Sequence, residues 1–539
     1  MAEPMVESQQ ILLSRQKDNQ TEKKAMTRAA GVVGVWTSLS RVLGFVRDMV
    51  IAKYMGAGLT ADAFFVAFRI PNLLRRLFAE GALSAAFIPT FVETLQKNGT
   101  AEADRLARVA FTFSAIVLAL VTALGIVFSP WIVRIIAPGF FQDPDKFALT
   151  VSLNRIMFPY IFFISLVALA SGVLNSMGRF AAPAAAPLLL NISMIASVAI
   201  FCTFLNVSPP FALAWSVVAA GILQLVLQLP FMANLGITLR PAFNFRYPPL
   251  LSIGRLFGPA AFGGAVYQIN VMIGTILASM LQPGGVSWLY YADRLVELPL
   301  GMFAVALGTA VLPSMSRQAG NGDMAALNQS LSFSLRLTAF FTIPASLALI
   351  VLREPIVAVL FQRGRFTAFD TQQTAYALLW YTAGLWAFSG LKVVTQAFFS
   401  LKDTKTPVKI SVVAVVVNLA GGLLLMGPME QGGLALATSL AAAMNFLILF
   451  VLLIRRLGIF PLADFVTSLG KITAASASMC VPLLYGQLYG EWGKGFTSLN
   501  LVVLTACIAA GLIIFAAVAY LLRCRELLAL WTNVRGVWK

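Results

Sequence analysis

The segment GALSAAFIP (81–89) has a counterpart in VALGTAVLP (305–313), and Pro313 minus Pro89 gives an offset of 224 in residue number. The same offset separates SMGRFAAP (176–183) from SLKDTKTP (400–407). Two further pairs keep this offset to within one residue: Pro130 with Pro355, and Gly139 with Gly364. Chance similarity between apolar segments would not readily hold one offset in four places. We therefore infer a parallel internal repeat, which is typical of transporters that rock one half against the other.

Long apolar runs surround these segments and decide the class of fold. Of the 539 residues, 59% are hydrophobic and 11% are charged, whereas an average globular chain is about 25% charged. Apolar runs of about 18 residues or more indicate membrane-spanning helices, and these runs are too long for barrel strands and lack their alternation. We predict an all-α polytopic membrane protein with fourteen transmembrane helices. The predicted spans lie near residues 28–54, 61–96, 105–136, 147–177, 184–206, 211–235, 251–281, 286–316, 326–352, 371–401, 407–426, 431–455, 467–489 and 498–522.

The repeat also predicts how the chain is divided. Six spans return the chain to the same side of the membrane, so the two halves of the repeat form two six-helix lobes in the same orientation. We assign residues 1–26 to a polar cytoplasmic tail, 27–245 to the first lobe and 246–460 to the second. Residues 461–539 fall outside the repeat and hold two additional helices and a second cytoplasmic tail. The candidate helix kinks are Pro71, Pro159 and Pro344.

Much of the net charge of +17 reflects membrane topology. With the amino terminus inside, Lys and Arg concentrate in the inside segments, while the outside segments 55–60, 207–210, 282–285 and 427–430 carry none. This asymmetry follows the positive-inside rule. The main exception is the outside segment 353–370, which contains three arginines. We predict that both termini are cytoplasmic and that the charge does not indicate a nucleic-acid partner.

The composition argues against an enzyme. The sequence contains no histidine, which is the commonest general base and metal ligand. The four cysteines are scattered singly, so neither a zinc site nor a redox pair is indicated. We therefore predict no catalytic residues and no bound metal.

Several charged residues lie inside predicted spans, where each costs roughly 2.5–3.5 kcal/mol on insertion scales. One interpretation is structural. Arginine side chains can extend to the membrane interface, or they can pair with acids one helical turn away, as the spacings Arg76–Glu80 and Arg294–Glu297 allow.

The other interpretation is that the arginines bind an anionic substrate. They lie in long apolar spans and come from both halves of the repeat, so they could converge on one central cavity. A guanidinium presents a planar donor fork that suits phosphate and carboxylate, and cationic walls concentrate an anionic head group. The predicted substrate-binding residues are Arg41, Arg47, Arg75 and Arg294. The predicted supporting or gating residues are Asp48, Asp62, Arg76, Glu80, Asp293 and Glu297.

Three segments resemble the MurJ (MviN) family of lipid II flippases, in the multidrug/oligosaccharidyl-lipid/polysaccharide exporter superfamily. They are SRVLGFVRD (40–48), ADAFFVAFRIPNLLRRLFAEGALSAAFIP (61–89) and SWLYYADRLVELPLGMFAVALGTAVLPSMS (287–316). The resemblance covers residues 28 to about 525, and the tail over 1–26 lies beyond the family core.

The resemblance implies two six-helix lobes in a V shape and two carboxyl-terminal helices that form a groove for a lipid tail. It implies alternating-access transport of undecaprenyl-pyrophosphate-GlcNAc-MurNAc-pentapeptide from the cytoplasmic to the periplasmic face of the bacterial inner membrane, for peptidoglycan synthesis. The implied partners are this lipid II, membrane lipids and the cell-wall synthesis machinery. The family's cavity arginines fall on Arg41, Arg47, Arg75 and Arg294, and its neighbouring acids fall on Asp48, Asp62 and Glu80.

Rival functions stay open at this point. The first is a flippase for another undecaprenyl-linked glycan. The second is an ion-coupled drug antiporter of the same superfamily, which would favour an acidic cavity rather than a basic one. No cofactor is predicted, and coupling to Na⁺ or to the membrane potential is a hypothesis. Some family members are thought to hold sodium in the second lobe with acidic residues, whereas the seventh span here has Gln268 and Asn270 but no carboxylate.

Overall fold

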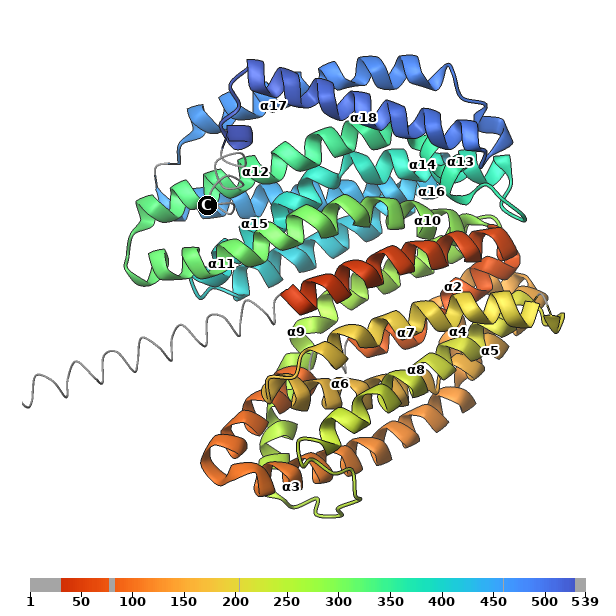
Figure 1. Cartoon of the computed structure of the whole chain (residues 1–539), viewed down its shortest axis with the longest axis vertical. Coiled ribbons are helices and arrows are strands. Elements are labelled where there is room, and N and C mark those ends of the chain that lie inside the picture. Colours follow the sequence, from red (N-terminus) through yellow and green to blue (C-terminus); the bar gives the residue numbers. More distant parts are fainter. Residues whose placement is uncertain (1–30, 77–82, 203, 459, 529–539) are drawn as a thin grey trace, which may run out of the picture. The chain divides into compact units, whose positions relative to one another are not determined.

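The computed structural model describes residues 31–76, 83–202, 204–458 and 460–528, and these are helical without a β-strand (Figure 1). Seven described helices are long and apolar enough to cross a membrane, or eight if the bent pair α14–α15 counts as one span. The prediction of an all-α polytopic membrane protein is confirmed. The number of fourteen spans stays a prediction.

The helices of the first half correspond to the first six predicted spans. The first helix covers residues 31–55. The elements that follow are α2 (Leu59–Leu74), α3 (Ser84–Val127), α4 (Ser129–Ile136), η2 (Pro138–Gln142), α5 (Pro144–Met157), α6 (Tyr160–Ser176), α7 (Ala181–Ser197), η3 (Val198–Cys202) and α8 (Pro209–Ala233).

The second half continues the series to the end of the described chain. Its elements are α9 (Pro248–Ser279), α10 (Gly285–Pro299), η4 (Leu300–Ala304), α11 (Val305–Gly320), α12 (Met324–Val351), α13 (Arg353–Phe361), α14 (Ala368–Ala383), α15 (Leu385–Ser400), α16 (Lys405–Leu457), α17 (Leu462–Gln487), η5 (Trp492–Lys494) and α18 (Ser498–Leu521).

The internal repeat reappears in the bounds of these helices. Helix α5 begins at Pro144 and α14 begins at Ala368, which is the same offset that separates the repeated segments of the sequence. Helices α6 and α15 end at Ser176 and Ser400, again with this offset, and α7 and α16 begin with it. Equivalent sequence positions therefore begin and end equivalent helices in the two halves.

Local sequence signals account for several helix ends. At the start of α14, the Thr367 hydroxyl accepts from the Asp370 N–H while the Asp370 carboxylate accepts from the Thr367 N–H, which is a capping box. Asp323 caps α12 by accepting from Ala326 N–H at 2.9 Å. Such contacts satisfy the free N–H groups of a helix's first turn.

Backbone breaks divide the longest helices where the sequence predicts separate spans. Helix α3 breaks at Gly99, where φ is 80°, and α16 breaks at Glu430, where φ is 48°. The second break separates the predicted spans 407–426 and 431–455. Pro159 lies at the boundary between α5 and α6, whereas Pro71 and Pro344 lie inside continuous helices.

The chain folds into two compact units, and the division falls inside the 31–55 helix, α2, α5 and α9. Unit 1 contains the described residues up to Asp48 together with Ile70–Phe128 and Asn154–Gly264. Its core is formed by α3, α6 and the residues that lead into α9, with Phe87, Phe91 and Leu106 almost fully buried.

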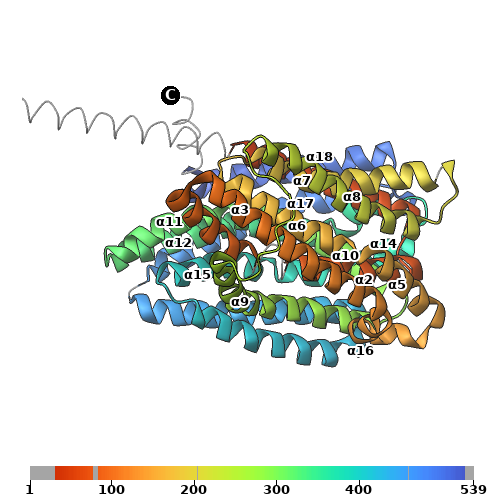
Figure 2. The same cartoon turned by 90° about the horizontal axis from the view of Figure 1, so that it is seen from below.

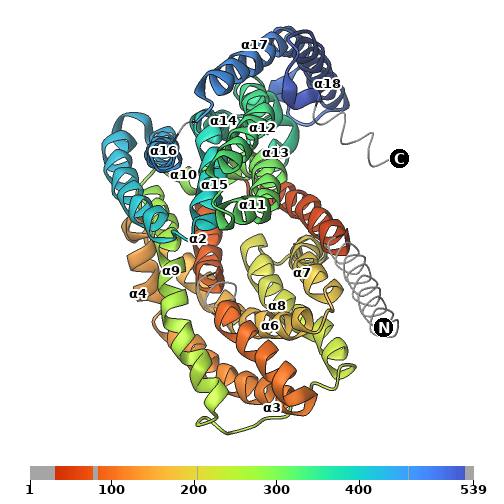
Figure 3. The ribbon, with the colours of Figure 1, turned by 90° about the vertical axis from the view of Figure 1, so that its left-hand side faces the viewer.

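Unit 2 contains Met49–Arg69, Ser129–Leu153 and the described residues from Ala265 onward. Helices α11, α12 and α15 lie side by side within it (Figures 1 and 2). The two additional helices, α17 and α18, form an antiparallel pair that packs on α12 (Figure 3). A second apolar core that includes Leu352, Ile472 and Met479 joins this pair to α12 and α13.

Two of the three arginines of segment 353–370, which depart from the positive-inside rule in the predicted topology, lie at helix ends. Arg353 donates to the Ile350 carbonyl at 2.9 Å, near the end of α12. Arg363 donates to the carbonyls of Val359 at 2.7 Å and Leu360 at 2.9 Å, in the last turn of α13. A cation at a helix carboxyl terminus satisfies free carbonyls and complements the helix dipole. These charges therefore stabilise helix ends.

We expect Arg363→Leu to lower the free energy of unfolding by about 1.5–3 kcal/mol, because two hydrogen bonds from a charged group to helix carbonyls are lost. The guanidinium also lies 4.5 Å from the centre of the Phe496 ring, which ties α13 to the α17–α18 pair. Thermal unfolding of the purified chain in detergent measures the change. Arg365→Leu is the matched control, because that side chain is exposed. Equal effects of the two substitutions would contradict the assignment.

Candidate substrate site

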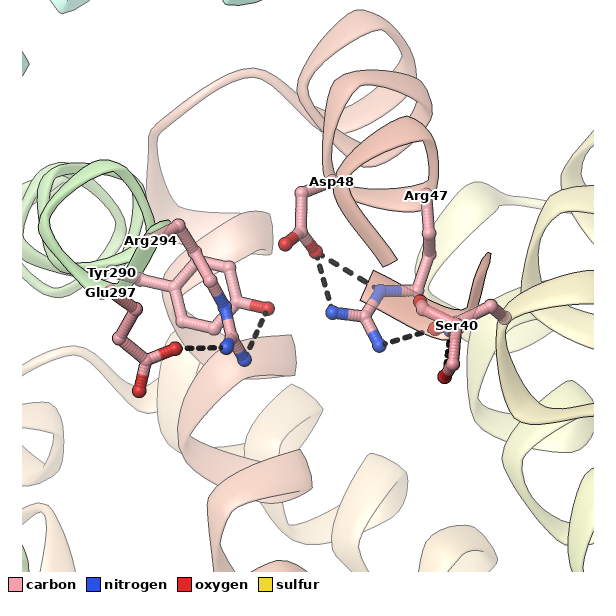
Figure 4. Close-up of polar contacts among 7 residues, drawn as sticks. Ser40, Arg47, Asp48, Tyr290, Arg294 and Glu297 are labelled. Carbon is pink, nitrogen blue, oxygen red and sulfur yellow. Dashed lines mark hydrogen bonds and ion pairs between the residues drawn. The ribbon is translucent and has the colours of Figure 1, made fainter. Parts of the chain in front are cut away.

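In unit 1, the predicted site residue Arg47 is held in place from two sides. Its Nε and Nη2 donate to Asp48 Oδ1 at 3.0 and 2.7 Å, and its Nη1 donates to Asn191 Oδ1 at 3.1 Å (Figure 4). Asn191 lies on α7 and donates in turn to the Ser40 carbonyl at 2.9 Å. The Arg47 residue is 7% exposed and Asp48 is 1% exposed. In this conformation Arg47 and Asp48 join the 31–55 helix to α7.

The other predicted arginines of unit 1 are more accessible. Arg41 is exposed, and Arg75 is half-buried with its Nε donating to Asn72 Oδ1 at 3.3 Å. Arg75 and Arg76 follow the last residue of α2 in a wider helical turn, and Arg76 is exposed. Glu80 lies outside the described residues. The Arg76–Glu80 pairing suggested by the sequence is therefore not part of the described structure.

In unit 2, Arg294 on α10 is fixed by neighbours one turn away on the same helix. Its Nη1 donates to Glu297 Oε2 at 2.6 Å and its Nη2 donates to the Tyr290 hydroxyl at 3.3 Å (Figure 4). The guanidinium lies 5.0 Å from the centre of the Tyr290 ring, and that ring stacks on Phe65 of α2 at 3.9 Å between centroids. The Arg294 side chain is nevertheless 31% exposed. The Arg294 guanidinium is therefore held in one position and is still accessible to a ligand.

Asp293, the neighbour of Arg294, belongs to another polar group of unit 2. Together with Arg69 it lies near enough to Tyr381 of α14 to act on it electrostatically. Arg69 also donates to Thr275 Oγ1 at 2.9 Å. The hydrogen bond joins α2 to α9, and Asp293 of α10 and Tyr381 of α14 lie within electrostatic range of each other, although only Asp293 stands among the predicted site residues.

Asp62 is the centre of a deeply buried polar cluster of unit 2. It is 0% exposed, and its Oδ2 accepts from Lys146 Nζ at 2.8 Å and from Gly284 N–H at 2.8 Å. Its Oδ1 accepts from the N–H and the hydroxyl of Ser287, at 2.9 and 2.6 Å. The carboxylate thus caps the amino terminus of α10, where a negative charge is favoured. It joins α2, α5 and α10.

Lys146 is the partner that sequence reasoning missed. In the predicted topology the lysine lies in an outside segment between the third and fourth spans, and from the sequence it counts only as one of the charges that set topology. In the structure it is 4% exposed, and its Nζ lies 4.0 Å from the centre of the Phe140 ring. The internal repeat could have indicated this contact region, because Asp62 and Ser287 are separated by nearly the repeat offset. Equivalent positions of the two halves meet at this point.

Two glycines of unit 2 also lie where equivalent positions of the two halves of the repeat meet. Gly139 packs on Ser279 at the end of α9 and donates its N–H to Ser279 Oγ at 3.2 Å. Gly364 packs on the Lys53 carbonyl, near the end of the 31–55 helix, and the next residue donates its N–H to that carbonyl at 2.9 Å. A Cβ on either glycine would overlap the backbone beneath it. Each half of the repeat thus places a loop glycine on a helix end of the other half.

In unit 2, Asn270 of the seventh predicted span belongs to a cluster of uncharged side chains that hydrogen-bond one another. Asn418 Nδ2 donates to Asn270 Oδ1 at 2.9 Å, and the Thr438 hydroxyl lies 3.2 Å from Asn418 Oδ1. Across the part of the chain that the structure describes, no group of three or more Asp, Glu, His or Cys side chains comes together. The cluster offers no carboxylate, and the amide oxygens of Asn270 and Asn418 already accept hydrogen bonds from within it.

The long apolar helices, the parallel repeat and the arginines within helices define a polytopic α-helical membrane transporter. Residues 51–503 match the family model described as lipid II flippase MurJ. The chain belongs to this family.

Individual relatives agree with this assignment. A probable lipid II flippase MurJ of Vibrio cholerae is 37% identical, with 94% of this chain and 98% of that protein covered. A lipid II flippase MurJ of Burkholderia cenocepacia is 38% identical, with 92% and 96% covered. A solved structure of a lipid II flippase MurJ in an inward closed conformation has a TM-score of 0.75 at 27% identity, with 91% and 98% covered. A multidrug transporter of the MATE family, 14% identical, shares the fold with a TM-score of 0.66, over 78% and 94% of the two chains.

Proposed function

We propose that the chain moves lipid II, the undecaprenyl-pyrophosphate-linked GlcNAc-MurNAc-pentapeptide, from the cytoplasmic to the periplasmic face of the inner membrane. The observation that carries the proposal is the state of Arg294: a guanidinium within a membrane helix that is fixed by Tyr290 and Glu297 yet partly exposed. A fixed donor fork binds phosphate oxygens with little loss of side-chain freedom. Membership of the family supplies the identity of the substrate.

Arg294 acts together with the arginines of unit 1 in this proposal. Arg41 and Arg75 are accessible in the structure and contact the pyrophosphate directly. Arg47 is paired with Asp48 in the described conformation, so it contacts substrate only after a phosphate replaces that carboxylate. The common site rests on the repeat, which supplies arginines from both halves, and on the family.

The transport cycle proceeds by alternating access. In the proposed topology, with both termini cytoplasmic, the Asp62 cluster and the two packed glycines belong to the outside ends of the helices. Their contacts keep this end closed in the described conformation. Substrate then enters from the cytoplasmic side, and these contacts open to release it outside. The lipid tail stays in the bilayer or along the exposed apolar surface of α17 and α18, where Leu484 and Leu512 are more than half exposed.

Movement of a cationic site across the bilayer provides a route for coupling to the membrane potential. Each elementary charge moved through 100 mV is worth about 2.3 kcal/mol. Because the second-lobe cluster is neutral, we favour the membrane potential over Na⁺ as the driving gradient.

Reconstitution of the full chain with fluorescent lipid II tests the proposal. We expect the parent to move labelled lipid II between leaflets. Arg294→Ala should slow this movement by about 10- to 100-fold, since a charge-assisted hydrogen bond is worth about 1.5–3 kcal/mol. Arg294→Lys should recover only part of the rate, because the donor fork is lost. The measurement is the rate at which the label becomes accessible to an impermeant quencher.

Two controls make this assay decisive. Arg317→Ala removes an exposed arginine at the end of α11 and should leave the rate unchanged. An undecaprenyl-pyrophosphate glycan that lacks the pentapeptide tests the rival substrate. If Arg294→Ala moves lipid II as fast as Arg317→Ala, the proposed role of Arg294 is wrong. Equal rates for both lipids would contradict specificity for lipid II.

A further inference from the structure

The segment that joins α8 to α9, residues 238–247, is fixed against the side of α3 although it is not helical. The Thr238 N–H and hydroxyl donate to Asp104 Oδ1 at 2.6 and 3.2 Å. Four residues later, the Ala242 N–H donates to the Thr112 hydroxyl at 3.0 Å. All of these residues belong to unit 1. Figure 3 shows this irregular segment beside α3.

Tyr247 fixes the far end of the segment. Its hydroxyl donates to Glu102 Oε1 at 2.7 Å, and the Arg105 guanidinium lies 5.2 Å from the centre of its ring. Burial, together with the hydrogen bond to Glu102, raises the pKa of Tyr247 to about 12. The hydroxyl therefore keeps its proton and its donor role at physiological pH. The segment has one defined conformation and a defined outer face.

The outer face of the segment carries aromatic rings that remain substantially exposed. Phe243 is 73% exposed and Phe245 is 42% exposed, and their ring centroids are 6.3 Å apart. Phe245 also contacts Phe113 of α3, at 5.8 Å between centroids, and Phe113 is 41% exposed. Exposed aromatic rings that already pack on one another form an apolar surface, and such a surface is suited to contact with a partner or a membrane.

The position of these rings along α3 identifies the environment. From Phe113 onward, the outward face of α3 is apolar and open at Ile116, Leu120 and Leu124, which are 48%, 61% and 47% exposed. These residues recur at helical spacing within a candidate membrane span, so they face lipid chains. Residues 100–108, just before Phe113, are largely polar and charged. The aromatic rings therefore lie where the lipid-facing stripe ends, at the level of the head groups, which is where aromatic side chains gather.

Two exposed arginines, Arg240 and Arg246, stand on either side of the aromatic rings. Side chains that combine cations with interfacial aromatics match the surface of a leaflet that contains anionic phospholipids. We propose that residues 238–247, with Phe113, form a docking surface for anionic phospholipid: the rings enter the head-group layer and the two arginines bind lipid phosphates. This surface lies on the lipid-facing side of unit 1 and is independent of the residues proposed to bind lipid II.

The depth of Phe243 in the bilayer tests the proposal. The full chain, with its four cysteines replaced by alanine, carries a nitroxide on Phe243→Cys and is placed in lipid nanodiscs. The matched control is a nitroxide on Asn321→Cys, in the exposed and polar turn between α11 and α12. We expect the ratio of collisions with oxygen to collisions with a water-soluble nickel chelate to be several-fold higher at 243 than at 321. Equal ratios overturn the proposal.

The lipid class is tested in the same samples. Nanodiscs of phosphatidylcholine alone are compared with nanodiscs that also contain phosphatidylglycerol. We expect the nitroxide at 243 to lie deeper when phosphatidylglycerol is present, and we expect the double variant Arg240→Gln/Arg246→Gln to lose this difference. Equal depth in both lipids overturns the assignment to anionic lipid. Dipolar broadening between labels of two chains would show instead that a second copy covers the surface, and this also overturns the proposal. Lipid II transport by the arginine double variant should stay at the parent rate, which separates this test from that of the proposed function.

Discussion

Replacing Asp62 by alanine is expected to lower the free energy of unfolding by about 3–5 kcal/mol, because removing one partner of a buried ion pair leaves the other charge unpaired. The partner is Lys146, which is 4% exposed and 2.8 Å from the Asp62 carboxylate. The substitution also removes the acceptor for Gly284 N–H and for Ser287 at the start of α10. Thermal unfolding of the detergent-purified chain measures the loss as a lower Tm.

A double substitution separates the buried charge from the loss of packing. Asp62→Leu/Lys146→Met removes both charges and fills the space with apolar groups, so it should be clearly more stable than Asp62→Ala, since apolar replacement of a whole buried pair is often neutral. Lys97→Met is the surface control: it breaks the exposed pair with Glu93 and should change stability by about 1 kcal/mol or less. If Asp62→Ala is as stable as the parent, the buried pair does not contribute as proposed.

The fold was largely predictable from the sequence because its signals are local. Apolar runs located the helices, and one constant offset in residue number predicted the repeat that the helix bounds show. One detail was not predictable. Pro344 fits inside a continuous α12, so proline alone did not mark a break.

The candidate site was less predictable because a contact between two segments that are distant in the sequence leaves no pattern in either segment alone. Arg294 and Glu297 were recognised as a pair because they lie one turn apart on α10. The role of Asn191 in holding Arg47 was invisible, since the two residues lie far apart in the sequence. In the sequence, Lys146 resembled any other lysine of a segment predicted to lie outside the membrane. Only the repeat offset, applied to Asp62 and Ser287, could have suggested where the two halves touch.

The repeat offset also relates Gly139 to Gly364, and the two glycines make equivalent contacts. Gly139 and Gly364 are separated by nearly the repeat offset, and so are the backbone positions beneath them, Lys53 and Ser279. A parallel repeat brings equivalent elements around one axis, so a contact made by one half is repeated by the other. The absence of a Cβ lets each loop approach a helix end closely enough for a hydrogen bond. At this end of unit 2, which the proposed topology places outside, the two halves are therefore held together by two equivalent glycine contacts.

Gly364→Ala is expected to open this end of the protein. Gly364 has φ of 62°, which costs an alanine about 1–2 kcal/mol, and its Cβ would also overlap the Lys53 carbonyl. Relief of that overlap requires the loop to leave the helix end, so conformations with an open outside end gain population. A cysteine at Ala61, which is 0% exposed beside Asp62, reports the change in a chain without its native cysteines. We expect an impermeant maleimide added outside to label this cysteine several-fold faster in Gly364→Ala than in the parent. Gly139→Ala should act in the same direction.

Gly322→Ala is the control that isolates the overlap from backbone strain. Gly322 has φ of 72°, but a Cβ there would meet nothing within 4 Å. It therefore introduces similar strain without displacing a neighbouring segment, and the labelling rate at position 61 should equal that of the parent. Equal labelling in Gly322→Ala and Gly364→Ala would mean that strain, and not the close approach of the two halves, controls this end. Faster labelling in Gly364→Ala alone would establish the glycine contact as part of the closure that alternating access must break.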